Sequence, residues 1–192
     1  MSQTVYWRRT DVIGLERLEL ARGADGIEAS GTVLCLEDGG FELAHRWRLS
    51  PEWQAQSVEV ERRDAGGAVR LAVERQGDGW LVDGVRRSDL DGAEEPDLSV
   101  TPLCNAFPIR RLAAPAASVR ELDVCFIDAD TMSVTRARQR YERIDVHRVR
   151  YVSIDGASAG FTAELVVDDD GLVRTYEHLF ERVEPTGPAG GG

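Results

Sequence analysis

Apolar and polar side chains alternate with a period of two over most of this chain, and this alternation restricts the fold more than any other feature. It is clearest in Phe41–Leu49, Val69–Val73 and Phe161–Val167. A strand with this pattern has one face in the core and one face towards solvent. Similar patterns predict further strands at Leu15–Ala21, Ile27–Glu37, Gln54–Arg63, Gly79–Asp83, Val119–Ile127, Ser133–Arg143, His147–Ile154 and Leu172–Tyr176.

Glycine-containing turns separate these segments. Asp170-Gly171, for example, predicts a hairpin that joins Phe161–Val167 to Leu172–Tyr176. No amphipathic helix is evident, although a short helix would fit in Asp128–Thr131 or Tyr176–Arg182. The sequence therefore predicts an all-β, single-domain, antiparallel sheet that curls into a roll or a partly open barrel with few or no helices. We expect this domain over residues 1–183 and a disordered tail over 184–192, EPTGPAGGG.

The charge balance restricts the partners. The net charge is −11, from 34 acids against 23 bases, which argues against binding to nucleic acid or to an anionic membrane surface. The chain holds no window of about 18 apolar residues, which indicates that it has no integral membrane segment. The N-terminus, MSQTVYWRRT, lacks the order of a secretory signal, so a cytoplasmic location is expected. The pattern leaves the oligomeric state open.

The sequence contains no recognisable motif for a metal, a cofactor or a catalytic nucleophile. All bases are arginine, which excludes mechanisms that need a lysine. The three cysteines, Cys35, Cys104 and Cys125, are far apart and flanked by apolar residues, as buried reduced thiols are. His45, His147 and His178 have no partner at ligand spacing, and His45 falls on the apolar face of its strand. We therefore assign no metal, no cofactor and no catalytic residue.

Two polar patterns allow more than one interpretation. Asp128 and Asp130 would serve as an acid–base pair, but an Asp-rich turn is favoured. Arginines alternate along two neighbouring predicted strands, at Arg136, Arg138 and Arg140 and at Arg148 and Arg150. They form either a solvated face that is paired with acids, which is favoured, or a surface for an acidic head group. On the opposite face, Gln139 and Tyr141 are predicted to line the interior.

The segment Asp97–Leu112, DLSVTPLCNAFPIRRL, departs from the alternation. Pro102 and Pro108 argue against a regular helix, and they bias the residues before them towards extended backbone. If the end of the segment is extended, Arg110 and Arg111 point to opposite faces. The segment is then either a structural plug that crosses the roll or the lip of an entrance, and these interpretations are compatible.

This segment resembles the signature D-x-x-x-T-P-x-x-N-x-x-P-I-R-R-L of a bacterial family described as putative glycolipid-binding proteins. The matching residues are Asp97, Thr101, Pro102, Asn105, Pro108, Ile109, Arg110, Arg111 and Leu112. Further matches include Gly14-Leu15-Glu16, Trp47, Trp53, Gly79-Trp80, Gln139-x-Tyr141, Asp170-Gly171-Leu172-Val173, Tyr176 and Phe180. The resemblance implies a spiral β-roll similar to bacterial carriers of lipoproteins and lipids, and glycolipid binding. Those carriers work outside the cytoplasm.

The resemblance and the all-β pattern together predict a non-enzymatic protein that binds a glycolipid or similar amphiphile inside a β-roll. The candidate ligand-binding residues are Asn105, Arg110, Arg111, Gln139, Tyr141, Trp47 and Trp80. Tryptophans at a cavity mouth can stack on sugars or acyl chains, although tryptophans most often pack in the core. The alternatives are an enzyme for a small polar substrate that uses Asp128, Asp130, Tyr141 and an arginine, or a structural β protein that binds a partner.

Overall fold

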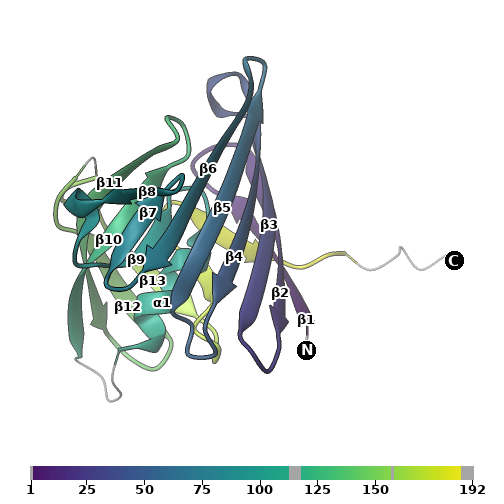
Figure 1. Cartoon of the computed structure of the whole chain (residues 1–192). Helices are drawn as coiled ribbons and strands as arrows, with labels where there is room; N and C mark the ends of the chain where they lie inside the picture. The colour runs from purple at the N-terminus through teal and green to yellow at the C-terminus, as the bar shows by residue number, and fades with distance from the viewer. Residues whose placement is uncertain (1, 113–117, 157, 187–192) are drawn as a thin grey trace, which may run out of the picture.

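The computed structural model describes residues 2–112, 118–156 and 158–186, which form one curled sheet (Figure 1). The first eight strands are β1 (Ser2–Arg9), β2 (Gly14–Arg22), β3 (Ile27–Cys35), β4 (Phe41–Leu49), β5 (Ala55–Asp64), β6 (Gly67–Gln76), β7 (Gly79–Val82) and β8 (Val85–Arg87). The others are β9 (Ala93–Leu98), β10 (Val119–Asp128), β11 (Ser133–Arg143), β12 (Arg148–Ser153), β13 (Thr162–Val167), β14 (Val173–Tyr176) and β15 (Phe180–Val183). The predicted all-β fold is confirmed.

The strand order is β8-β7-β6-β5-β4-β3-β2-β1-β15-β14-β13-β12-β11-β10-β9. Neighbours are antiparallel, as predicted, except for the parallel pair β9 and β10. The sheet curls without closing, because β8 and β9 remain as its two edges. Pro96 lies in β9, where an edge strand tolerates a residue that cannot donate a ladder hydrogen bond.

The alternation in the sequence places the core on the concave side of the sheet. In β3 and β4 every second residue is buried and the residues between them are exposed. The 3₁₀ helices η1 (Glu37–Gly39) and η2 (Ser88–Leu90) occupy connections between strands. The stretches at Asp128–Thr131 and Tyr176–Arg182 contain no helix; the first is a hairpin turn and the second a strand pair, so this part of the prediction is wrong.

A short helical plug fills the inside of the curl. The 3₁₀ helix η3 (Pro102–Asn105) continues into α1 (Ala106–Arg110), which lies within the sheet in Figure 1. Residues 102–109 are all buried. The expectation that the prolines exclude a helix here, and that the backbone is extended, is wrong. Pro102 opens η3 and Pro108 lies in the first turn of α1, where missing N–H groups are tolerated.

The plug begins at Thr101, whose Oγ1 accepts a hydrogen bond of 3.2 Å from the Leu103 N–H and caps η3. Phe107 on α1 is fully buried, and its ring meets Trp47 of β4 edge to face at 5.5 Å. The prediction of a segment that plugs the roll is therefore confirmed. The predicted tail at 184–192 lies outside the described residues from 187 onwards.

Candidate functional site

An open cleft of about 420 Å³ lies beside the plug. One wall comes from the end of β9 and from β10, and the other comes from β12, from the segment that leads into β13, and from β14 and β15. Its lining residues are Asp97, Leu98, Ser99, Thr101, Asn105, Phe126, Tyr151, Ser158, Ala159, Phe161, Tyr176, Leu179 and Phe180. The volume falls within the range of about 300–1,000 Å³ that is usual for small-molecule sites.

Aromatic rings dominate the wall of this aromatic cleft. The centroid of Tyr151 lies 5.9 Å from that of Tyr176 and 6.2 Å from that of Phe161. Tyr176 lies 6.1 Å from Phe180, and Phe126 also lines the cleft. Strands β12, β14 and β15, with the residue before β13, bring these side chains together from distant parts of the sequence. Such rings offer apolar faces for stacking.

A buried chain of hydrogen bonds, which we call the polar floor, borders the cleft. Asn105 Nδ2 donates to the Tyr141 hydroxyl at 2.9 Å, and that hydroxyl donates to Gln139 Oε1 at 3.2 Å. Gln139 Nε2 in turn donates to Asp97 Oδ2 at 2.5 Å. Burial raises the pKa of Asp97 above its ordinary value, against the hydrogen bonds from Gln139 and Cys104. Burial also holds the pKa of Tyr141 well above its ordinary value, so this hydroxyl stays protonated.

A second buried group stands behind Thr101. The Thr101 hydroxyl donates to Glu16 Oε1 at 2.8 Å, and His45 Nε2 lies 3.0 Å from the same oxygen. His45 Nδ1 accepts from the Trp47 indole N–H at 2.8 Å. Because indole is only a donor, His45 Nδ1 is the acceptor of this bond, which leaves Nε2 to face Glu16. Gly31 makes this arrangement feasible, since a Cβ there would lie 2.2 Å from the His45 ring.

The structure brings three of the predicted site residues together. Asn105, Gln139 and Tyr141 form the polar floor, and Asn105 also lines the cleft. Gln139 and Tyr141 face the interior, as predicted from their alternation in β11. Whether these residues bind a ligand stays a prediction.

The two arginines lie elsewhere and point in different directions, because successive residues at a helix end are rotated by about 100°. The Arg110 guanidinium stacks 4.4 Å from the Trp53 ring and donates to the Asp170 carbonyl. Arg111 contacts the buried carboxylate of Glu95 at 2.5 Å. Neither arginine lines the aromatic cleft.

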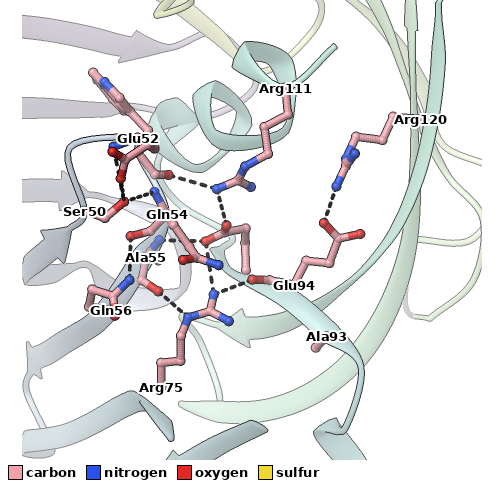
Figure 2. A network of polar contacts seen from close by, with 12 residues as sticks. Ser50, Glu52, Gln54, Ala55, Gln56, Arg75, Ala93, Glu94, Arg111 and Arg120 are labelled. Carbon is pink, nitrogen blue, oxygen red and sulfur yellow. Dashed lines mark hydrogen bonds and ion pairs between the residues drawn. The ribbon is translucent and has the colours of Figure 1, made fainter. Parts of the chain in front are cut away.

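Arg111 belongs to a polar network that joins the two ends of the sheet, shown in Figure 2. Arg75 of β6 donates to the carbonyls of Ala55 and Glu94 at 2.8 and 2.6 Å. Glu95 Oε2 accepts from the Ala55 N–H at 2.9 Å. Side chains thus link β5 and β6 to β9 across the seam where the curl stays open. The charge of Arg111 is thus paired with Glu95 at this seam.

The two tryptophans of the predicted site are fully buried. The Trp47 N–H is bonded to His45, and the Trp80 N–H donates to the Ala93 carbonyl at 2.8 Å. Trp80 also stacks on the Arg75 guanidinium at 4.3 Å. Neither lines the aromatic cleft, so both fit the core alternative better than stacking at a cavity mouth.

The favoured interpretations of the other polar patterns hold. Asp128 Oδ1 accepts from the N–H groups of Asp130 and Thr131, which makes an Asp-rich turn. The arginines of β11 and β12 form exposed ion pairs with neighbouring acids: Arg136 and Arg138 with Asp123, Arg140 with Glu121 and Glu142, Arg148 with Asp145 and Glu164, and Arg150 with Glu142. The three cysteines are buried free thiols.

The described residues include no cluster of three metal-ligating side chains. His45 is a hydrogen-bonded core histidine, as predicted. None of the helices in residues 2–112, 118–156 and 158–186 has the length and apolar character needed to cross a membrane.

The sequence interpretation missed most of the cleft. In the sequence, Asp97 stands out only as the first residue of the signature, and Tyr176 and Phe180 only as supporting matches. Tyr151 and Phe161 were not singled out. The sequence did contain a signal for this wall. Tyr151 and Tyr176 are aromatic residues at inward positions of the half-buried strands β12 and β14.

Comparison with known proteins identifies relatives of this fold. A crystal structure of a DUF1089 family protein from Pseudomonas aeruginosa matches with a TM-score of 0.78 and 28% sequence identity, over 88% of this chain and 92% of that chain. None of the curated proteins matches. The family model described as "Putative glycolipid-binding" matches residues 4–182. That match covers nearly the whole chain, including the plug and every wall of the cleft, and the chain therefore belongs to this family.

Proposed function

We propose that the chain binds an amphiphile non-covalently in the aromatic cleft, with a polar head group against Asp97 and Asn105 and an apolar part against the rings. The observation that carries this proposal is the combination of five aromatic rings with three buried or half-buried polar side chains, those of Asp97, Thr101 and Asn105, in one cleft of about 420 Å³. Sites of this kind are mostly apolar with a few fixed polar groups.

Each part of the cleft has a chemical counterpart in such a ligand. The faces of Tyr151, Phe161 and Tyr176 suit the C–H faces of a sugar ring or an acyl chain. An acyl chain gains about 0.8 kcal/mol for each methylene that leaves water. Asp97 and Asn105 supply hydrogen-bonding groups at one end. The family's description as glycolipid-binding is consistent with this division.

The alternative of an enzyme that uses Asp128 and Asp130 has less support. These acids lie in the β10–β11 turn, and Asp128 is occupied by backbone N–H groups. Tyr141 is buried and holds its hydroxyl in the polar floor. No acid–base pair therefore converges at the cleft from the predicted residues.

Native mass spectrometry of the chain purified from its natural host, followed by organic extraction, tests the proposal. We expect an added mass that is released by solvent and identified as an amphiphile.

In titrations with octyl glucoside, Phe161→Ala should weaken binding by about tenfold, since it removes one stacking face. Val85→Ala, on the exposed edge strand β8, is the control. Absence of any bound amphiphile, together with no response to octyl glucoside, would contradict the proposal.

A further inference from the structure

Within the part of the chain that the structure describes, Asp97 has no ion pair with an arginine, and only uncharged side chains act on it. The groups that act on its carboxylate are the Gln139 amide and the Cys104 thiol, and both are uncharged. Many surface acids of this fold are paired with arginine, as Asp123 is with Arg136 and Arg138. A carboxylate held away from water is costly unless a positive charge accompanies it. Asp97 lines the cleft, so a ligand can supply that charge.

A second acid lies behind the same wall. The Glu16 side chain is 1% exposed, and its Oε1 accepts from Thr101, which lines the cleft. The same oxygen lies 3.0 Å from His45 Nε2, and the other ring nitrogen of His45 accepts from the Trp47 N–H. Among the described residues, Glu16 Oε2 has no hydrogen-bond partner at all. Arg9, whose guanidinium lies 5.6 Å from the Phe180 ring, is already paired with Asp11.

The aromatic rings of the cleft also favour a cation. The face of an aromatic ring is negative and attracts a cation within about 6 Å of its centroid, the more so where water is excluded. Tyr151, Tyr176 and Phe180 are each at least nine-tenths buried around the cleft. Asp97 is close enough to both tyrosines to disfavour their ionisation. Rings and carboxylates together form an aromatic cage with an acidic end.

We propose that the head group received by this cleft carries a protonated or quaternary amine, which pairs with Asp97 and is enclosed by Tyr151, Tyr176 and Phe180. The inference rests on the proposed function and narrows its ligand class. Anionic head groups such as phosphates and carboxylates are disfavoured, because they would meet Asp97 with no arginine to offset it. The amine has two potential sources, an amino sugar or an alkylammonium group.

Ligands with one tail and different heads test the charge preference. The full chain is titrated, by calorimetry below micelle-forming concentrations, with octyl glucoside, octyl glucosaminide, octyltrimethylammonium and octanoate. We expect one or both of the cationic compounds to bind about 10- to 100-fold more tightly than octyl glucoside, as charge-assisted contacts allow, and octanoate to bind least. The stronger of the two cationic compounds identifies the source of the amine.

The variant Asp97→Asn should remove this preference, so that both cationic compounds bind to it within about threefold of octyl glucoside, a difference below 1 kcal/mol. Asp25→Asn is the matched control, because Asp25 is an exposed acid in the turn between β2 and β3. Should Asp97→Asn not fold, Phe180→Leu replaces it, since this change removes a ring face but keeps an apolar side chain. It should weaken octyltrimethylammonium more than octyl glucoside.

A pH series on the unmodified chain supplies an independent readout, because octyltrimethylammonium does not titrate. The groups that face Asp97 are Gln139, Cys104, Asn105, Tyr141, Tyr151 and Tyr176, with Glu16 beyond Thr101. The pKa values of Cys104 and the tyrosines are raised, so these groups stay neutral in acid. Ammonium binding should therefore weaken as pH falls through the pKa of Asp97, and Asp97→Asn should lose this dependence.

The outcomes separate the two proposals. If octanoate or octyl glucoside binds as tightly as both cationic compounds, the amine inference is overturned and the proposed function stands. If binding of octyltrimethylammonium is unchanged in Asp97→Asn, the inference is likewise overturned. If none of the octyl compounds binds and no amphiphile is present in protein from the host, both proposals fail.

Discussion

Gly31 illustrates how one missing side chain positions a buried polar group. Its Cβ would lie 2.2 Å from the His45 ring and 3.1 Å from Glu16 Oε1. We expect Gly31→Ala to lower the free energy of unfolding by about 2–4 kcal/mol, through overpacking and the loss of the His45–Glu16 hydrogen bond. Urea unfolding measures this. Gly23→Ala is the control, because its Cβ would meet only a carbonyl at 3.7 Å, and it should change stability by less than about 1 kcal/mol.

The ionised form of Asp97 should lower the free energy of unfolding of the chain. Burial raises its pKa from the ordinary value of 3.8, so the folded chain binds this proton more tightly than the unfolded chain does. The contribution of this group to stability therefore increases as pH falls through its folded pKa, and is absent at neutral pH. Thermal unfolding across pH should show Asp97→Asn at least as stable as the original chain near neutrality, with that advantage shrinking in acid.

A different outcome for Asp97→Asn would change the account of the cleft. If the variant is much less stable at neutral pH, the ionised carboxylate is a structural acceptor for Gln139 and Cys104. If it is more stable, the chain retains an acid that its fold does not need. Such a residue is typical of a binding site, where function is kept at a cost in stability.

At the level of elements, regular alternation was sufficient to predict strands and insufficient to predict edges. The observed bounds of β4 and β11 are those predicted, Phe41–Leu49 and Ser133–Arg143, because each combines a strict alternation with clear turns. Strand β9 was missed because its sequence, AEEPDL, is acidic and contains proline. Its strand conformation depends on pairing with β10 and on the seam contacts of Glu95, which are tertiary interactions.

The same reasoning explains what was predicted of the cleft. Gln139 and Tyr141 were correctly placed in the interior, since their alternation with arginines fixes the side of the sheet. The aromatic wall was missed, because Tyr151, Phe161 and Tyr176 meet only when β12, β13 and β14 pair. The extended backbone expected at Arg110 and Arg111 was wrong, because the chain forms a short helix there.

Glu95 should contribute far more to the seam than its neighbour Glu94. Glu95 is 2% exposed and contacts Arg111, with Arg75 at 3.7 Å, and burial raises its pKa despite these partners. We expect Glu95→Gln to lower the free energy of unfolding by about 2–4 kcal/mol, because it leaves two half-buried guanidinium groups without a counterion. Glu94→Gln, which affects only the half-exposed pair with Arg120, should cost less than about 1 kcal/mol.

Chemical denaturation of Glu95→Gln and Glu94→Gln compares their free energies of unfolding, and proteolysis is a second measurement. We also expect Glu95→Gln to increase cleavage near β8 and η2, which lead into β9 along the chain, because the contacts of Glu95 hold β9 in place. Equal costs for the two substitutions would indicate that backbone contacts alone hold the seam.

On the scale of the whole molecule, the sheet and its plug are one structural unit. The curl has two free edges and no closing ladder, so its interior must be filled by something other than a second sheet. The plug meets this need with buried residues from Pro102 to Ile109. It also supplies Thr101 and Asn105 to the cleft, so the segment that completes the core also shapes the candidate site.

The plug should therefore determine the stability of the entire chain rather than of one region. Phe107 is fully buried and contacts the ring of Trp47, which is also fully buried. We expect Phe107→Ala to lower the free energy of unfolding by about 3–5 kcal/mol, through lost burial and the cavity that remains. Leu36→Ala, at a side chain that is 68% exposed, should change it by less than about 0.5 kcal/mol.

Tryptophan fluorescence and far-UV circular dichroism should report one shared transition in both variants. Two separate transitions in Phe107→Ala would contradict the view that plug and sheet unfold together.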